Sequence, residues 1–147
     1  MYEKFMFEAI GQAQKAKAEG NFPFGAVIVQ NNEIVATGHC LELTERDVTK
    51  HAELIAISNA CKLLGRMSLN DYVLVASGEP CNMCASAAFQ AEIGTVIIGA
   101  SRLDLRNFFR QREIGIREFA RDAGHQIKIV SGVLREDAMK LFEGVTK

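Results

Sequence analysis

Residues 72–84 read YVLVASGEPCNMC, and this stretch decides the fold. The apolar run over 72–76 predicts a buried strand, and the polar residues 77–80 predict a sharp exit from it. Proline is favoured at the first position of a helix, so Pro80 predicts the start of a helix that carries both Cys81 and Cys84. A buried strand that leads directly into a helix is typical of α/β proteins.

The segments on either side continue this alternation. The spacing of apolar residues predicts four further helices and four further strands, with a hairpin turn at 30–33 and a loop at 42–50. The helices are expected at 2–18, 51–65, 106–121 and 135–143, and the strands at 24–29, 34–37, 95–99 and 126–130. The order predicts one α/β domain over 1–147, with a mixed sheet and helices on its faces.

Length, composition and charge limit the classes of function. The chain has 147 residues, 48% of them hydrophobic and 24% charged, which is ordinary for one globular domain. Its 17 Lys and Arg against 18 Asp and Glu give a net charge of −1, so we expect no nucleic-acid partner. It has neither a secretory signal nor an apolar run of about 18 residues, which favours a cytoplasmic location and no membrane partner.

Cys81 and Cys84 form a C-x-x-C pair thirty residues after His51. A lone C-x-x-C is a weak signal, because core cysteines occur at this spacing by chance. Here, however, His51 and the cysteine pair each lie at the start of a predicted helix, where a thiolate is favoured over a thiol. The three-residue step from Cys81 to Cys84 puts both sulfurs on one face of the helix. Zinc prefers tetrahedral nitrogen and sulfur ligands, and a catalytic zinc keeps one position open for water. We therefore expect His51, Cys81 and Cys84 to bind one Zn²⁺ per chain.

Glu53 is the predicted catalytic residue. It lies too close to His51 along the helix to be an obvious fourth ligand, but close enough to face a zinc-bound water. A carboxylate there can take the proton of the water and deliver it to a ring nitrogen of a substrate. Alone, a glutamate in a first helical turn more often only stabilises the helix dipole.

H-A-E at 51–53, followed by P-C-x-x-C at 80–84, is the signature of zinc deaminases. The chain resembles the cytidine deaminase superfamily over nearly its whole length. Together with Pro23-Phe24-Gly25-Ala26-Val27, these motifs are similar to the branch of guanine, cytosine and tRNA adenosine deaminases. The resemblance implies a three-layer α/β/α sandwich with a five-stranded mixed sheet, the same three zinc ligands, Glu53 as proton shuttle, and hydrolytic deamination.

Cys40 stands where this branch usually has a substrate-binding asparagine, eleven positions before the zinc histidine. A thiol cannot replace a carboxamide that both donates and accepts hydrogen bonds. A one-residue shift of the alignment would place His39 there, so His39 is a candidate substrate contact. A second departure is Asp47-Val48-Thr49-Lys50, where relatives usually read Asp-Pro-Thr-Ala.

Further substrate contacts are predicted around this centre. The backbone N–H groups near Ala52 and Cys81 lie at helix starts and can orient a polar edge of the substrate. By resemblance to guanine deaminases, Asp104 is a candidate to contact a purine. Phe24 is a candidate to stack on a ring, as are Phe108 and Phe109, although such residues also belong to cores.

We expect a deaminase of a small nucleobase-like heterocycle that works as a homodimer or larger homo-oligomer, packed through Met83, Ala87, Ala88 and Ala91. Two alternatives stay open. A tRNA adenosine deaminase would use the arginine-rich segment 102–121, in which acidic residues interleave with the arginines. A structural zinc module would need a fourth protein ligand, for which Cys40 is the only candidate.

Overall fold

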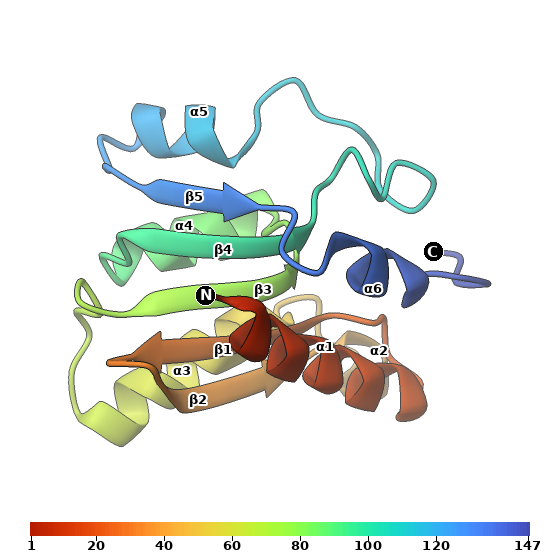
Figure 1. Ribbon diagram of the computed structural model, residues 1–147, viewed down its shortest axis with the longest axis horizontal. Coiled ribbons are helices and arrows are strands. Elements are labelled where there is room, and N and C mark those ends of the chain that lie inside the picture. Colours follow the sequence, from red (N-terminus) through yellow and green to blue (C-terminus); the bar gives the residue numbers. More distant parts are fainter.

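The computed structural model describes residues 1–147, which form one five-stranded sheet (Figure 1). The strand order is β2-β1-β3-β4-β5; β1 runs antiparallel to β2 and β3, whereas β3, β4 and β5 are parallel. The strands are β1 (Gly25–Gln30), β2 (Glu33–His39), β3 (Val73–Gly78), β4 (Thr95–Ala100) and β5 (Lys128–Ser131). The predicted mixed sheet is confirmed.

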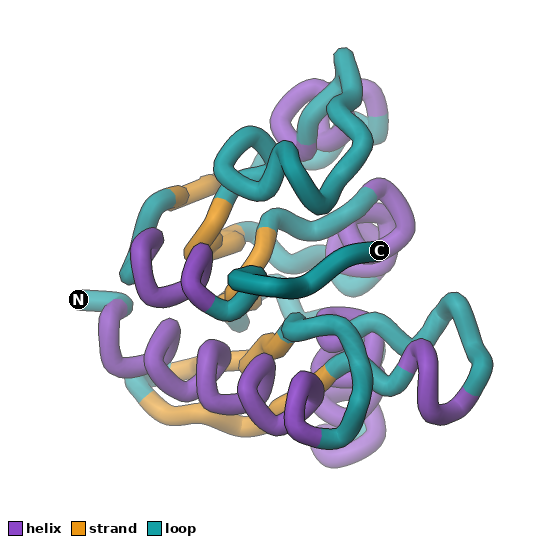
Figure 2. Tube along the Cα trace, turned by 90° about the vertical axis from the view of Figure 1, so that its right-hand side faces the viewer, coloured by secondary structure: helices purple, strands orange, loops and turns teal.

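Helices cover both faces of the sheet, which gives the predicted three layers (Figure 2). One face is covered by α1 (Glu3–Ala18) and α6 (Arg135–Lys140). The opposite face is covered by α3 (Ala52–Leu64), α4 (Asn82–Gln90) and α5 (Ile116–Asp122). None of these helices is both long and apolar enough to cross a membrane.

The inner strand β1 explains why both faces are covered. Side chains alternate between the faces of a strand, so Val27 and Val29 pack under α1 while Ala26 and Ile28 pack in the opposite core. All four are buried. A strand with two apolar faces is stable only between two helical layers.

The first turn of α3 lies very close to β2 at Gly38. A Cβ added to Gly38 would lie 2.3 Å from the carbonyl oxygen of Ala52 and 2.6 Å from the amide nitrogen of Ala56. Both are backbone atoms of α3 and cannot move aside without moving the helix. Glycine at this position therefore sets the distance between α3 and the sheet.

We expect Gly38→Ala to lower the free energy of unfolding by about 1–3 kcal/mol, the usual cost of overpacking. Gly11→Ala is the matched control, because Gly11 lies inside α1 with no atom within 4 Å of an added Cβ. Alanine there should raise the free energy of unfolding by about 0.5–1 kcal/mol. Denaturant unfolding of both variants checks the opposite signs, and equal effects would contradict the role given to Gly38.

The predicted helix at 106–121 is wrong for its first ten residues, since α5 begins only at Ile116. Turns precede it, and Ser101 and Asp104 exchange hydrogen bonds there: Ser101 N–H donates to Asp104 Oδ2 and Asp104 N–H to Ser101 Oγ. Such local side-chain bonds compete with helix formation. The apolar residues in the turns imitate helical spacing, but Leu105 packs in the α1 core.

Three smaller differences concern residues 42–46, Pro80 and the predicted oligomer face. A short helix, α2 (Glu42–Glu45), lies inside the predicted loop and ends at Arg46, which has a φ of 52°. Pro80 lies before α4 rather than in it, because Cys81 is the N-cap residue. Ala88 and Ala91 of the predicted oligomer face are buried within the chain itself, whereas Met83 and Ala87 are half-buried. The homodimer stays a prediction.

Candidate active site

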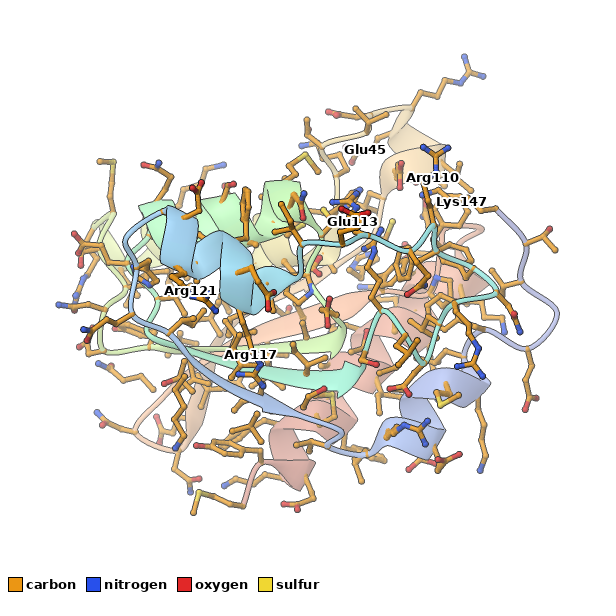
Figure 3. All side chains as sticks on the ribbon, turned by 90° about the horizontal axis from the view of Figure 1, so that it is seen from above. Glu45, Arg110, Glu113, Arg117, Arg121 and Lys147 are labelled. Carbon is orange, nitrogen blue, oxygen red and sulfur yellow. The ribbon has the colours of Figure 1, made fainter.

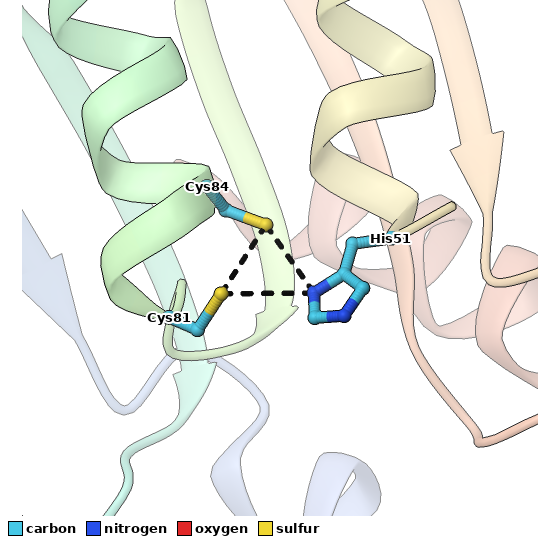
Figure 4. A group of neighbouring side chains, drawn as sticks. All are labelled: His51, Cys81 and Cys84. Carbon is cyan, nitrogen blue, oxygen red and sulfur yellow. Dashed lines mark hydrogen bonds between the residues drawn. The ribbon is translucent and has the colours of Figure 1, made fainter. Parts of the chain in front are cut away.

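Two helix starts bring three metal-binding side chains together (Figure 4). His51 is the N-cap residue of α3, Cys81 is the N-cap residue of α4, and Cys84 follows one turn into α4. His51 Nδ1 lies 3.6 Å from Cys81 Sγ and 3.5 Å from Cys84 Sγ, and the two sulfurs are 3.7 Å apart. The three atoms form a nearly regular triangle.

This triangle fits a zinc ion. With Zn–S near 2.3 Å and Zn–N near 2.0–2.1 Å, tetrahedral angles put neighbouring ligand atoms roughly 3.5–3.8 Å apart. The observed distances of 3.5, 3.6 and 3.7 Å fall in that range. No other group of three or more His, Cys, Asp or Glu side chains has ligand atoms this close together. The three predicted residues therefore fit a zinc ion and would supply three of its four ligands.

The thiols are prepared for metal binding. The hydrogen bond with Cys84, together with one to His51, lowers the pKa of the Cys81 thiol to about 3, although burial opposes the shift. The same hydrogen bond, with burial, raises the pKa of Cys84. The hydrogen bond between the two sulfurs thus favours the thiolate form of Cys81. Both ligand-bearing helix starts also favour negative charge.

The remaining nitrogen of His51 faces a carboxylate. Glu42 Oε2, on the short helix α2, lies 3.6 Å from His51 Nε2, which is an ion-pair distance rather than a hydrogen bond. Carboxylates beside the second nitrogen commonly orient metal-binding histidines. Glu42 therefore holds the ring with Nδ1 turned toward the two sulfurs.

Glu53 lies buried beside the zinc ligands. Only 5% of the residue is exposed, and its Oε2 accepts a hydrogen bond from Cys84 Sγ at 3.6 Å. Burial raises the pKa of Glu53 to about 7. A carboxyl group that gains and loses its proton near neutral pH is suited to general acid and base catalysis.

A pocket opens beside His51, Glu53 and Cys81. It has little free volume in this structure, about 30 Å³, and four phenylalanine side chains are among its lining residues. Ligand pockets ordinarily measure some hundreds of Å³, so a substrate ring needs these side chains to move. The other lining residues are Phe22, Phe24, Cys40, Glu42, Glu79, Phe108, Phe109 and Lys147.

The predicted substrate contacts divide into two groups. The pocket is lined by the three predicted stacking residues, Phe24, Phe108 and Phe109. It is also lined by Cys40, which stands where an asparagine was expected and is only 1% exposed. Ala52 is fully buried at the start of α3, between His51 and Glu53, and does not line the pocket.

His39 and Asp104 lie outside the pocket. His39 Nε2 is 2.8 Å from Glu19 Oε2, so its ring is occupied by a neighbouring carboxylate. Asp104 is 2.7 Å from Arg135 Nη2 and also accepts the Ser101 N–H bond, which together lower the pKa of its carboxyl group. In place of His39 and Asp104, the polar side chains of Glu42, Glu79 and Lys147 line the pocket.

Sequence reasoning missed four lining residues: Phe22, Glu42, Glu79 and Lys147. Glu79 stands two residues before Cys81 and Glu42 two residues after Cys40, so proximity to the motifs was an available signal. Lys147 is far from every motif in the sequence, and only the fold brings it to the pocket.

Comparison with known proteins gives the family and two kinds of relative. Residues 1–100 match the family model of the cytidine and deoxycytidylate deaminase zinc-binding region. The chain is 39% identical over 135 residues to the tRNA-specific adenosine deaminase of Bacillus subtilis (strain 168), covering 92% of this chain and 82% of that protein. It is 40% identical over 104 residues to the guanine deaminase of the same organism, covering 70% and 67%.

A solved structure of similar fold also comes from work on tRNA deaminases. It comes from biochemical and structural studies of A-to-I editing by tRNA:A34 deaminases. It matches this chain with a TM-score of 0.82 at 30% identity, covering 94% of this chain and 98% of that one.

These relatives contradict the expectation that the chain has no nucleic-acid partner, because several are enzymes named for tRNA. The net charge did not indicate a nucleic-acid partner because it sums the charges of the whole surface, whereas a nucleic acid contacts only one part of that surface. The match to the family model spans the zinc-binding residues, and the geometry of those residues agrees with it. The chain belongs to the cytidine and deoxycytidylate deaminase family of zinc-dependent hydrolases that act on C–N bonds.

Proposed function

We propose that this protein deaminates adenosine in a tRNA by hydrolysis, releasing ammonia and leaving inosine. The observation that carries the deaminase chemistry is the buried carboxyl group of Glu53 beside three zinc ligands at one pocket. The tRNA substrate is supported by the relative at 39% identity, whose match covers 92% of the chain and is not confined to the zinc-binding region. A cytoplasmic location is part of this proposal.

His51, Cys81 and Cys84 would hold a zinc ion, which when bound would lower the pKa of a water molecule in the site toward about 7. Glu53 takes the proton of this water and delivers it to the ring nitrogen beside the amino group. As the water oxygen adds to the carbon that carries the amino group, Glu53 would take the second proton, from the new hydroxyl group, and pass it to the amine, so that the C–N bond breaks and ammonia leaves. Glu53 thus moves every proton of the reaction, and its burial keeps bulk water from competing.

The test is a substrate panel for the zinc-loaded enzyme. An anticodon stem-loop RNA, free adenosine, guanine and cytosine are compared by ammonia release, and inosine in the RNA is measured by nucleoside chromatography. The proposal expects the RNA to have the highest kcat/KM. Faster turnover of a free base, with no inosine in the RNA, would overturn the tRNA assignment but leave the deaminase chemistry intact.

Guanine is a second candidate substrate, supported by the relative at 40% identity and by one feature of the pocket. Glu42 and Glu79 line the pocket with carboxylates, which when ionised only accept hydrogen bonds. Guanine presents a ring N–H and an amino group on one edge and can donate to such acceptors. Adenine has no ring N–H on that edge.

The residue at position 40 tests this second candidate. If guanine is a substrate, we expect Cys40→Asn to raise kcat/KM for guanine about tenfold, because a carboxamide adds a buried hydrogen bond where the thiol makes a weak one. Cys40→Ser is the control of similar size. Unchanged guanine turnover in both variants would show that position 40 does not contact the base.

A further inference from the structure

A groove beside the active-site pocket is lined by Arg102, Phe108, Phe109, Arg110, Arg112 and Lys147. We call it the basic groove. Phe108, Phe109 and Lys147 also line the pocket, so the two hollows are continuous. A molecule with its ring in the pocket would extend into the basic groove.

The four cations of the basic groove form no ion pair, although Arg102 lies close enough to Glu79 for the two charges to interact. None of the ion pairs in the structure involves Arg102, Arg110, Arg112 or Lys147. The nearby carboxyl group of Asp104 is paired with Arg135, and Glu79 lines the pocket rather than the groove. Arg102 is close enough to Arg112 for the second positive charge, after burial, to lower its pKa.

Contacts within the loop hold one of these cations, Arg102, in place. Arg102 Nε donates to the carbonyl oxygen of Arg110 at 3.2 Å, and Gln111 Nε2 donates to the carbonyl oxygen of Arg102 at 3.1 Å. The Arg102 guanidinium lies 4.3 Å from the centre of the Phe109 ring. The turns of the loop thus fix Arg102 and bring the exposed side chains of Arg110 and Arg112 to the same groove.

The arginine-rich segment has two separate parts. Figure 3 shows Arg110 near Lys147, whereas Arg117 and Arg121 lie on α5, away from them. The sequence analysis treated 102–121 as one helix with alternating charges. Because the first part is a loop, its arginines converge on the mouth of the pocket while acidic residues such as Glu113 stay outside the lining.

We propose that the basic groove binds a phosphate group of the substrate whose ring enters the pocket. Unpaired guanidinium groups recognise phosphate by charge and by paired N–H donors. The inference deepens the proposed function, since it requires a substrate that carries phosphate. An RNA supplies a phosphodiester beside the reacting nucleoside, and a mononucleotide supplies a terminal phosphate.

The experiment measures binding by the zinc-loaded full-length chain in a Glu53→Gln background, so that no ligand is consumed. The ligands are an anticodon stem-loop RNA, adenosine monophosphate and adenosine. Arg110→Gln and Arg112→Gln are compared with Arg121→Gln, which removes the same charge from α5. We expect each groove variant to weaken RNA binding about tenfold and to reduce the slope of log K against log salt by about 1, with adenosine binding unchanged.

Weaker binding of either phosphate-bearing ligand by the groove variants alone supports the proposal, and the affected ligand identifies the source of the phosphate. The proposal would be overturned if Arg121→Gln weakened binding as much as the groove variants, or if the groove variants also weakened binding of adenosine. It would also be overturned if the parent protein bound the phosphate-bearing ligands no better than adenosine. The proposed function is tested separately by inosine formation with Glu53 restored. Phosphate binding without inosine would reject the tRNA reaction but not the groove, and normal tRNA turnover by both variants would reject the groove but not the reaction.

Discussion

Glu53→Gln is expected to lower kcat by about 10²–10⁴-fold while the protein keeps about one zinc per chain. The side chain is buried beside the three ligands but is not one of them, so zinc affinity does not depend on its charge. Glutamine has nearly the same shape and cannot take up or release a proton. The loss is therefore expected in kcat, with little change in KM, because the ground-state contacts of the substrate remain.

Zinc analysis and steady-state kinetics on the same preparation check this prediction. Glu8→Gln is the control, since Glu8 is exposed on α1 and should leave both quantities unchanged. Replacement of a buried carboxyl group by a neutral amide should not lower the unfolding temperature, because burial of the charge is unfavourable. Full activity in Glu53→Gln would show that another group moves the protons, and loss of zinc would make Glu53 a ligand.

The sequence was sufficient to predict the parts of the structure that depend on local chemistry. Strands over 72–76 and 95–99 follow from short apolar runs, and the structure has β3 and β4 there. The zinc ligands followed from two helix starts, because a three-residue step puts the sulfurs of Cys81 and Cys84 on one face of a helix and His51 begins a second helix. These residues are informative because each motif lies in one turn of chain.

The rest of the site depends on contacts between distant segments. Lys147 reaches the pocket from the end of the chain, and no local pattern indicates that. In the segment after β4, Ser101 and Asp104 replace helical hydrogen bonds by turns, so the arginines that follow lie on a loop. Periodicity alone could not predict this, since Leu105 and Phe108 contact different parts of the molecule at helix-like spacing.

Cys81→Ser is expected to reduce the zinc content from about one per chain to near zero and to abolish deamination. A serine hydroxyl does not ionise near neutral pH and cannot replace a thiolate whose pKa is about 3. The loss should extend to stability, because zinc binds only the folded arrangement of α3 and α4 and therefore contributes to the free energy of folding. The unfolding temperature of the variant should lie close to that of the wild type stripped of metal.

A chelator separates loss of the metal from simple damage to the core. It should lower the unfolding temperature of the wild type and of Cys61→Ser, whose half-buried thiol lies outside the zinc site, but not that of Cys81→Ser, which has no zinc to lose. If Cys81→Ser keeps its zinc and still responds to the chelator, Cys81 is not a ligand. If the wild type neither contains zinc nor gains stability when zinc is added, the triangle of His51, Cys81 and Cys84 is a packing arrangement, and the deaminase mechanism fails with it.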